Sequence, residues 1–66
     1  MVNNQIEFDK EYPKEEKEIE IEYESFEEQL LIIEDYPDLE KIYLQNIDGI
    51  EKIILKNLTQ LQECTI

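Results

Sequence analysis

The chain has no histidine, one cysteine and one glycine among its 66 residues, and these scarcities exclude several kinds of site. Without histidine, nucleophilic sites built on Ser–His or Cys–His pairs and the usual zinc sites cannot form. A single glycine cannot supply a glycine-rich phosphate loop. The acidic spacing around Asp48 and Gly49 does not fit a calcium loop. We therefore expect no catalytic, cofactor-binding or metal-binding residues and no enzyme activity.

Cysteine and long apolar runs are also scarce. Cys64 has no second cysteine to pair with, so the sequence predicts a reducing compartment, the cytoplasm. No apolar run approaches the roughly 18 residues of a membrane helix, and the N-terminus has no signal-peptide pattern. Because no basic residue adjoins Cys64, we expect a small core residue there rather than a reactive thiol.

Positive charge is the third scarcity. Six lysines stand against 18 acidic residues, which gives a net charge of -12. Nucleic acids and anionic membranes would repel such a chain, so neither is expected as a partner. Eleven of the acids lie in residues 1–28, whereas 18 of the 27 hydrophobic residues lie from Leu30 onward. The distribution predicts an acidic lead-in followed by a core-forming part.

An eleven-residue repeat occupies the second part. Written in rows from Leu39, the sequence reads LEKIYLQNIDG, IEKIILKNLTQ and LQECTI, and the rows agree column by column. Each row predicts a short strand, such as Ile42-Tyr43-Leu44, followed by a corner. Two rows make one coil of about 22 residues with a strand on each side. We expect strand 31–33 beside 53–55 in one parallel sheet, and strand 42–44 beside 64–66 in the other.

An eleven-residue period also fits a right-handed helical coiled coil. The composition argues against it, because alanine is absent and isoleucine runs such as Ile53-Ile54 favour strands. Pro37 also falls where a helix would have to continue.

The columns resemble the leucine-rich repeat family, whose signature is Leu-x-x-Leu-x-Leu followed closely by Asn. The matches are Leu39-x-x-Ile42-x-Leu44-x-Asn46, Ile50-x-x-Ile53-x-Leu55-x-Asn57 and Leu61-x-x-Cys64-x-Ile66. The early asparagines resemble those of short variants with two strands per coil. The resemblance implies an α+β fold, in which a short N-terminal helical cap precedes a parallel two-sheet β-solenoid. Asn46 and Asn57 either form the family's hydrogen-bonded ladder or serve as turn residues that tolerate unusual φ.

The lead-in fits the same scheme. Ile19, Ile21 and Tyr23 alternate with glutamates, which predicts a strand with one wet face. The spacing from Ile19 to Ile42 is one position longer than a coil, and a longer corner would absorb the difference. Asn3 or Asn4 is expected to cap a short helix through Lys10, with Val2, Ile6 and Phe8 buried. Residues 1–29 are therefore the acidic helical cap and first strand, and residues 30–66 are the repeats.

The resemblance implies a non-catalytic module that binds other proteins across a sheet face. Ile32 and Ile54 are expected to point outward from one sheet and Tyr43 from the other, as candidate partner-binding residues. The C-terminal end has no cap, so a homodimer or further repeats should cover its apolar residues, which are Ile53, Leu55, Leu58 and Leu61. The alternative function is a small acidic inhibitor that imitates nucleic acid on a basic enzyme surface.

Overall fold

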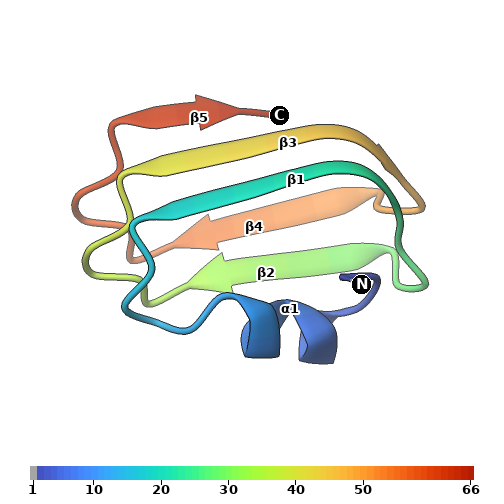
Figure 1. Ribbon diagram of the computed structural model, residues 1–66, viewed down its shortest axis with the longest axis horizontal. Coiled ribbons are helices and arrows are strands. Elements are labelled where there is room, and N and C mark those ends of the chain that lie inside the picture. The colour runs from blue at the N-terminus through green and yellow to red at the C-terminus, as the bar shows by residue number, and fades with distance from the viewer. Residues whose placement is uncertain (1) are drawn as a thin grey trace.

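A computed structural model describes residues 2–66, which form one short helix and five strands in two sheets (Figure 1). All strand pairs are parallel. Sheet A has the order β1-β3-β5 and sheet B the order β2-β4. The predicted α+β class and the two parallel sheets are confirmed. The elements are α1 (Gln5–Glu11), β1 (Glu18–Ser25), β2 (Leu30–Glu34), β3 (Lys41–Asp48), β4 (Lys52–Lys56) and β5 (Glu63–Thr65).

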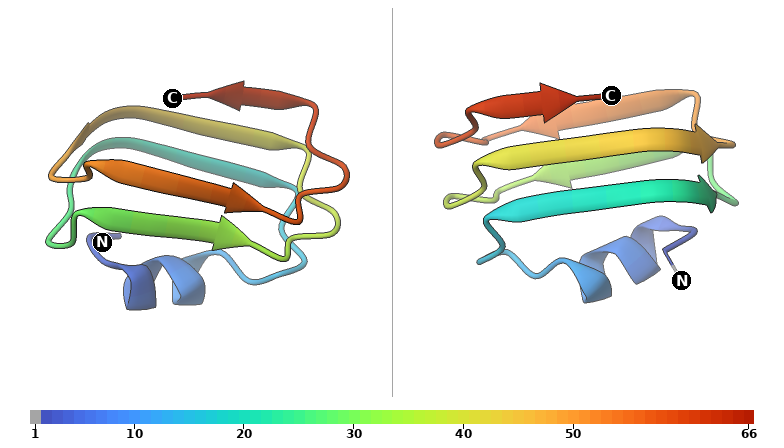
Figure 2. Two further views of the ribbon diagram at one scale, coloured as in Figure 1. Left: turned by 180° about the vertical axis from the view of Figure 1, so that it is seen from behind. Right: turned by 45° about the horizontal axis from the view of Figure 1, so that its top comes forward.

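Successive strands alternate between the two sheets (Figure 2). We call one pass through both sheets a circuit: β1 and β2 form the first, β3 and β4 the second, and β5 begins the third. Leu31 pairs with Ile53 and Ile42 with Cys64, which confirms the predicted pairing of residues one coil apart. Ile19 also pairs with Ile42, because the corner between β1 and β2 is one residue longer than that between β3 and β4.

The corners repeat as well as the strands. The backbone N–H of Leu39 donates to the Tyr36 carbonyl at 3.4 Å, and the N–H of Leu61, at the equivalent corner of the next circuit, donates to Leu58 at the same distance. Backbone bonds also join one circuit to the next at these corners, including Gln62 N–H to the Glu40 carbonyl at 2.9 Å.

Helix α1 starts as expected. The Asn4 side chain accepts a hydrogen bond from the Glu7 N–H at 2.9 Å and so caps the first turn. Val2 and Phe8 are buried, but Ile6 is 66% exposed and its expected burial is wrong. Two residues on a helix turn the side chain by about 200°, so Ile6 and Phe8 cannot both face the sheets.

The buried core lies entirely between Val2 and Leu44. The expectation that residues from Leu30 onward would form the core is therefore wrong in part, because five of its members precede Leu30. Cys64, expected in the core, is exposed, whereas its column neighbour Ile42 is covered by β1 on one side and β5 on the other. The buried residues are Val2, Phe8, Ile19, Ile21, Phe26, Leu31, Ile33, Tyr36, Leu39, Ile42 and Leu44.

One residue near the end of each of the first four strands has a left-handed backbone: Tyr23, Asp35, Asn46 and Asn57, with φ between 54° and 58°. The interpretation of both asparagines as residues that tolerate unusual φ is confirmed. Tyr23 was expected on the buried face but is 77% exposed. Its positive φ interrupts the alternation of β1, so the side chain leaves the face that Ile19 and Ile21 occupy.

Candidate functional site

The outward face of sheet B carries an apolar stripe across two strands. Ile32 of β2 and Ile54 of β4 are paired in register, and both side chains are half-buried. Leu30, two residues along β2 on the same face, is 41% exposed. The structure thus brings together two of the three predicted partner-binding residues. We call Leu30, Ile32 and Ile54 the sheet B stripe.

Lysines border this stripe. Lys52 pairs with Leu30, and Lys56 pairs with Glu34, so the residues two places before and after Ile54, on the same face of β4, are both lysines. These two lysines make the outward face of sheet B less acidic than the chain as a whole, whose net charge is -12. A partner here meets an apolar centre with a mixed polar rim, which is the usual anatomy of a protein interface.

Helix α1 closes the free edge of β2 beside the stripe. The Gln5 side chain donates to the Ile32 carbonyl at 3.0 Å and accepts from the Ile32 N–H at 2.8 Å, so one amide satisfies both backbone groups. The Lys14 amine donates to the Glu34 carbonyl at 2.7 Å. A hollow of about 150 Å³ between these groups is lined by Gln5, Asp9, Lys14, Ile32 and Glu34. Gln5 lies outside the repeat, so the repeat did not predict its contact with β2.

Tyr43 lies on the outward face of sheet A, between Glu20 on β1 and Thr65 on β5. Its side-chain hydrogen bond with Glu22 is the main cause that raises the pKa of its hydroxyl above 10.0. Tyr43 therefore belongs to an acidic surface on the opposite sheet. It is not part of the sheet B stripe.

Tyr36 anchors the cap and was missed as a structural residue. It is fully buried, and its hydroxyl donates a hydrogen bond to the Tyr12 carbonyl. The Lys14 amine sits 4.5 Å from the centre of its ring, and the Phe8 ring meets it edge-on. Burial, with smaller effects from Asp9 and Glu16, raises the pKa of Tyr36 to about 12. Tyr36 lies eleven residues before Ile47 and so shares a repeat column with Ile47 and Leu58, which could have indicated that its side chain is buried.

The end of the molecule formed by β4 and β5 is more open than the end covered by α1 (Figure 2). Leu55 is 39% exposed, and the other three predicted self-association residues, Ile53, Leu58 and Leu61, are half-buried. A hollow of about 350 Å³ opens there, lined by Ile50, Glu51, Lys52, Ile53 and Ile66. These residues gather at one end, as the repeat columns predict.

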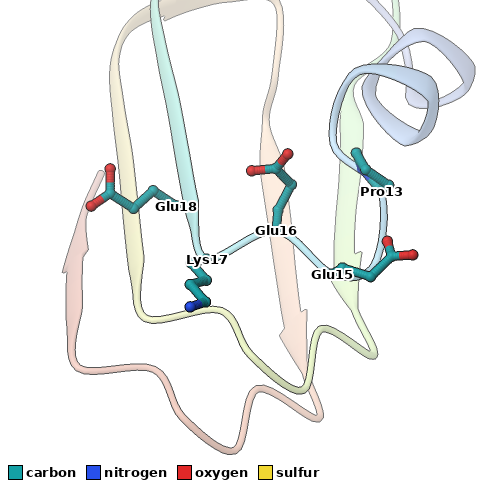
Figure 3. A pocket seen from close by; sticks show the side chains of 5 residues that line it. All are labelled: Pro13, Glu15, Glu16, Lys17 and Glu18. Carbon is teal, nitrogen blue, oxygen red and sulfur yellow. The ribbon is translucent and has the colours of Figure 1, made fainter.

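One hollow is lined mainly by acidic residues. A shallow hollow of about 400 Å³ after α1 is lined by Pro13, Glu15, Glu16, Lys17 and Glu18, but its acidic side chains point apart (Figure 3). Among residues 2–66, no group of three or more acidic or cysteine side chains is placed to hold a metal ion. The same residues contain no helix that is both long and apolar enough to cross a membrane.

Comparisons of the chain with protein-family models, with curated proteins and with solved structures gave no match in any of the three. Function must therefore be argued from the geometry of the sheet faces and of the open end.

Proposed function

We propose that this chain is the capped N-terminal part of a short leucine-rich-repeat-type solenoid and that it serves as a non-catalytic protein-recognition module. The offset between paired strands is 23 residues for β1 with β3 and 22 for the other two pairs. This near-constant offset, the repeated corner bonds and the recurring left-handed residues support a solenoid. The hydrogen bonds from the Gln5 side chain of α1 to the backbone of Ile32 support the role of this helix as the cap. The proposal places the protein in the cytoplasm, where the free thiol of Cys64 stays reduced.

The sheet B stripe is the observation that carries the recognition role. Ile32 and Ile54 lie side by side on the outward face of neighbouring strands, and neither is fully buried. Adjacent outward apolar residues on a sheet mark a contact surface. The family that the sequence resembles uses sheet faces in the same way. We therefore assign partner binding to this stripe and regard Tyr43 as a separate, secondary contact on sheet A.

Affinity capture with matched variants tests this role. Ile54→Glu should abolish the capture of proteins that bind the parent chain, because it puts a charge at the centre of the apolar stripe. Thr59→Glu adds the same charge at an exposed position in the corner between β4 and β5, outside both sheet faces, and should leave capture intact. Retention of every bound protein by Ile54→Glu, with an unchanged fold by circular dichroism, would contradict the proposal.

The outward face of β1 favours a second candidate, the inhibitor that imitates nucleic acid. Glu18, Glu20 and Glu22 are all exposed there and alternate with inward residues on one strand. In this case Glu20→Gln with Glu22→Gln would weaken binding, and added salt would weaken it steeply. Binding through the sheet B stripe should depend little on salt, so a salt titration separates the two functions.

A further inference from the structure

We infer that the outer edge of β1, the first strand of sheet A, binds an extended segment of another protein that carries lysine or arginine at alternate positions. The segment adds to sheet A as a further strand. This surface is separate from the sheet B stripe and goes beyond the proposed function. Unpaired backbone groups on the edge, a hollow beside them and the surrounding charge support the assignment.

Alternate residues of β1 direct their backbone groups away from β3. In a parallel ladder, successive residues direct their N–H and C=O groups to opposite sides of the strand. The Lys17 carbonyl, just before β1, accepts a hydrogen bond from the first residue of β3 at 3.2 Å, so Lys17 faces β3. The Glu20 carbonyl accepts instead from the Tyr12 hydroxyl of the cap at 2.8 Å. The backbone groups of Glu18, Glu20 and Glu22 therefore point to the outer edge.

The cap satisfies the edge of sheet B more fully than the edge of sheet A. On β2, the Gln5 side chain bonds both backbone groups of Ile32. On β1, the Tyr12 hydroxyl meets a single carbonyl, and among residues 2–66 no hydrogen bond reaches the outward N–H and C=O groups of Glu22. The cap runs beneath the first strands of both sheets (Figure 2) and leaves this part of the β1 edge open. Such edge groups pair with an extended segment that lies alongside them.

A hollow of about 290 Å³ lies between this edge and the cap. It gives an added segment room beside the unpaired groups of Glu22. No lysine of the described chain lines the hollow, so its charged side chains are all negative. The polar side chains that line it are those of Glu11, Tyr12, Glu20, Glu22 and Glu24.

Charge selects a basic segment as the occupant. The side chains of Glu18, Glu20 and Glu22 are exposed on the outward face of β1, and Glu11 and Glu24 are at the hollow. An added strand directs its side chains alternately to the two faces of the sheet, so lysines or arginines at alternate positions meet the glutamates of one face. Opposite charges across a strand pair stabilise it, and like charges destabilise it. A second copy that offered its own β1 would set glutamates against glutamates.

Pairing centres on Glu22. In an antiparallel pair, one residue of the segment exchanges both of its backbone hydrogen bonds with the residue opposite. A segment residue can bond Glu22 in this way, as the side-chain amide of Gln5 bonds Ile32 on the other sheet. The Tyr12 hydroxyl already occupies the neighbouring carbonyl of Glu20, so the paired stretch is short.

Fluorescence anisotropy with a labelled Lys-Val-Lys-Val-Lys peptide tests the site. The peptide should bind the parent chain, and Glu-Val-Glu-Val-Glu should not. The same lysine peptide with every backbone nitrogen methylated keeps its charge and loses its N–H donors, so it should bind at least tenfold more weakly. Equal binding of the methylated peptide would show attraction by charge alone and would overturn strand addition.

Variants of Glu22 separate its backbone from its charge. Glu22→Pro removes an N–H that points away from β3, which an edge strand tolerates, and should weaken binding at least tenfold. Glu22→Gln keeps that N–H and should weaken binding less. Glu51→Gln removes the same charge at an exposed position in the corner between β3 and β4 and should leave binding unchanged. Circular dichroism checks the fold of each variant.

Amide hydrogen exchange of the parent chain gives a test that needs no variant. The N–H of Glu22 should become protected when the lysine peptide is added, whereas the N–H of Ile21, which faces β3, should be protected with or without the peptide. Failure of the peptide to bind, or unchanged exchange at Glu22 when it binds, would overturn the assignment. None of these outcomes bears on capture through Ile54 on the sheet B stripe, so the proposed function would still stand.

Discussion

The amide of Asn57 donates a 2.8 Å hydrogen bond to the carboxylate of Asp35, and both residues have a left-handed backbone at equivalent corners of successive circuits. The bond runs from one circuit to the next, but it joins two side chains and so differs from a ladder of asparagine bonds to the backbone. The corresponding residue below Asn46 is Tyr23, which has no amide or carboxylate, so the equivalent corners of sheet A lack such a pair.

Substitution of Asn57 separates the two contributions of this residue. Asn57→Val should reduce the free energy of unfolding by about 1–2 kcal/mol, because a β-branched side chain is strained at a φ of 54°. Asn57→Gly keeps the backbone and loses only an exposed hydrogen bond, so it should cost less than about 1 kcal/mol. Urea denaturation measures both. Equal losses would show that the side-chain bond, and not the backbone, is what the corner requires.

Gly49 should tolerate no side chain. Its φ is 93°, and a Cβ atom there would lie 2.2 Å from the backbone oxygen of Phe26. Gly49→Ala should therefore destabilise the fold by about 2 kcal/mol or more, since the left-handed strain adds to a contact with backbone that must move. Thermal melting checks this value, with Glu51→Ala as an exposed control nearby. A loss no larger than that of the control would contradict the contact.

Tyr23 should be improved by substitution. It combines a φ of 57° with a mostly exposed side chain, so it carries backbone strain without much packing in return. Tyr23→Asn should stabilise the fold by about 0.5–1 kcal/mol, because asparagine adopts this conformation more readily. Tyr43→Asn, the same change in a neighbouring strand at a residue without a positive φ, should destabilise it. A stability loss in Tyr23→Asn would mean that the ring makes contacts worth more than the strain.

Two residues of one column should differ in their response to truncation. Ile33→Ala should cost about 3–5 kcal/mol, within the range for fully buried aliphatic side chains. Leu55→Ala should cost only about 1–2 kcal/mol in dilute solution, because its side chain is already 39% exposed. Denaturation at low protein concentration gives the comparison. Equal costs would mean that the last circuit is as well covered as the first.

The fold should lose stability in alkali because of Tyr36. Burial raises the pKa of its hydroxyl to about 12 from the ordinary 10.0, so between these values the unfolded chain releases a proton that the folded chain retains. The free energy of unfolding should then fall as the pH rises above 10, by up to about 1.4 kcal/mol per pH unit, and this effect should end near pH 12. Denaturation over that interval tests it. Tyr36→Phe should flatten the slope, and an unchanged slope would refute the assignment.

The repeat made the parallel pairings predictable, because the column agreement of Leu31 with Ile53 and of Ile42 with Cys64 is a property of sequence spacing. Burial was less predictable. The repeat spacing specifies which side chains point inward. It does not specify whether a further circuit covers them, and the exposure of Cys64 depends on that cover. The left-handed Tyr23 was hidden because tyrosine is not a usual residue for that conformation.

The candidate site was predictable in its apolar members and not in its polar ones. Ile32 and Ile54 follow from strand alternation and the constant offset of one coil. The bonds of Gln5 to Ile32 depend on how α1 packs against the edge of β2, which is distant in the sequence. A single glutamine in an acidic segment does not indicate such a contact.

The double hydrogen bond from Gln5 to Ile32 also bears on folding during synthesis. The cap leaves the ribosome before any strand that it protects, since chains emerge N-terminus first. Each later circuit can then settle on an edge whose far side is already sealed. In sheet B the free edge of the nascent molecule then moves from β2 to β4 as synthesis proceeds. Within sheet B, mispairing between neighbouring nascent chains should therefore be limited to the strand that was made last.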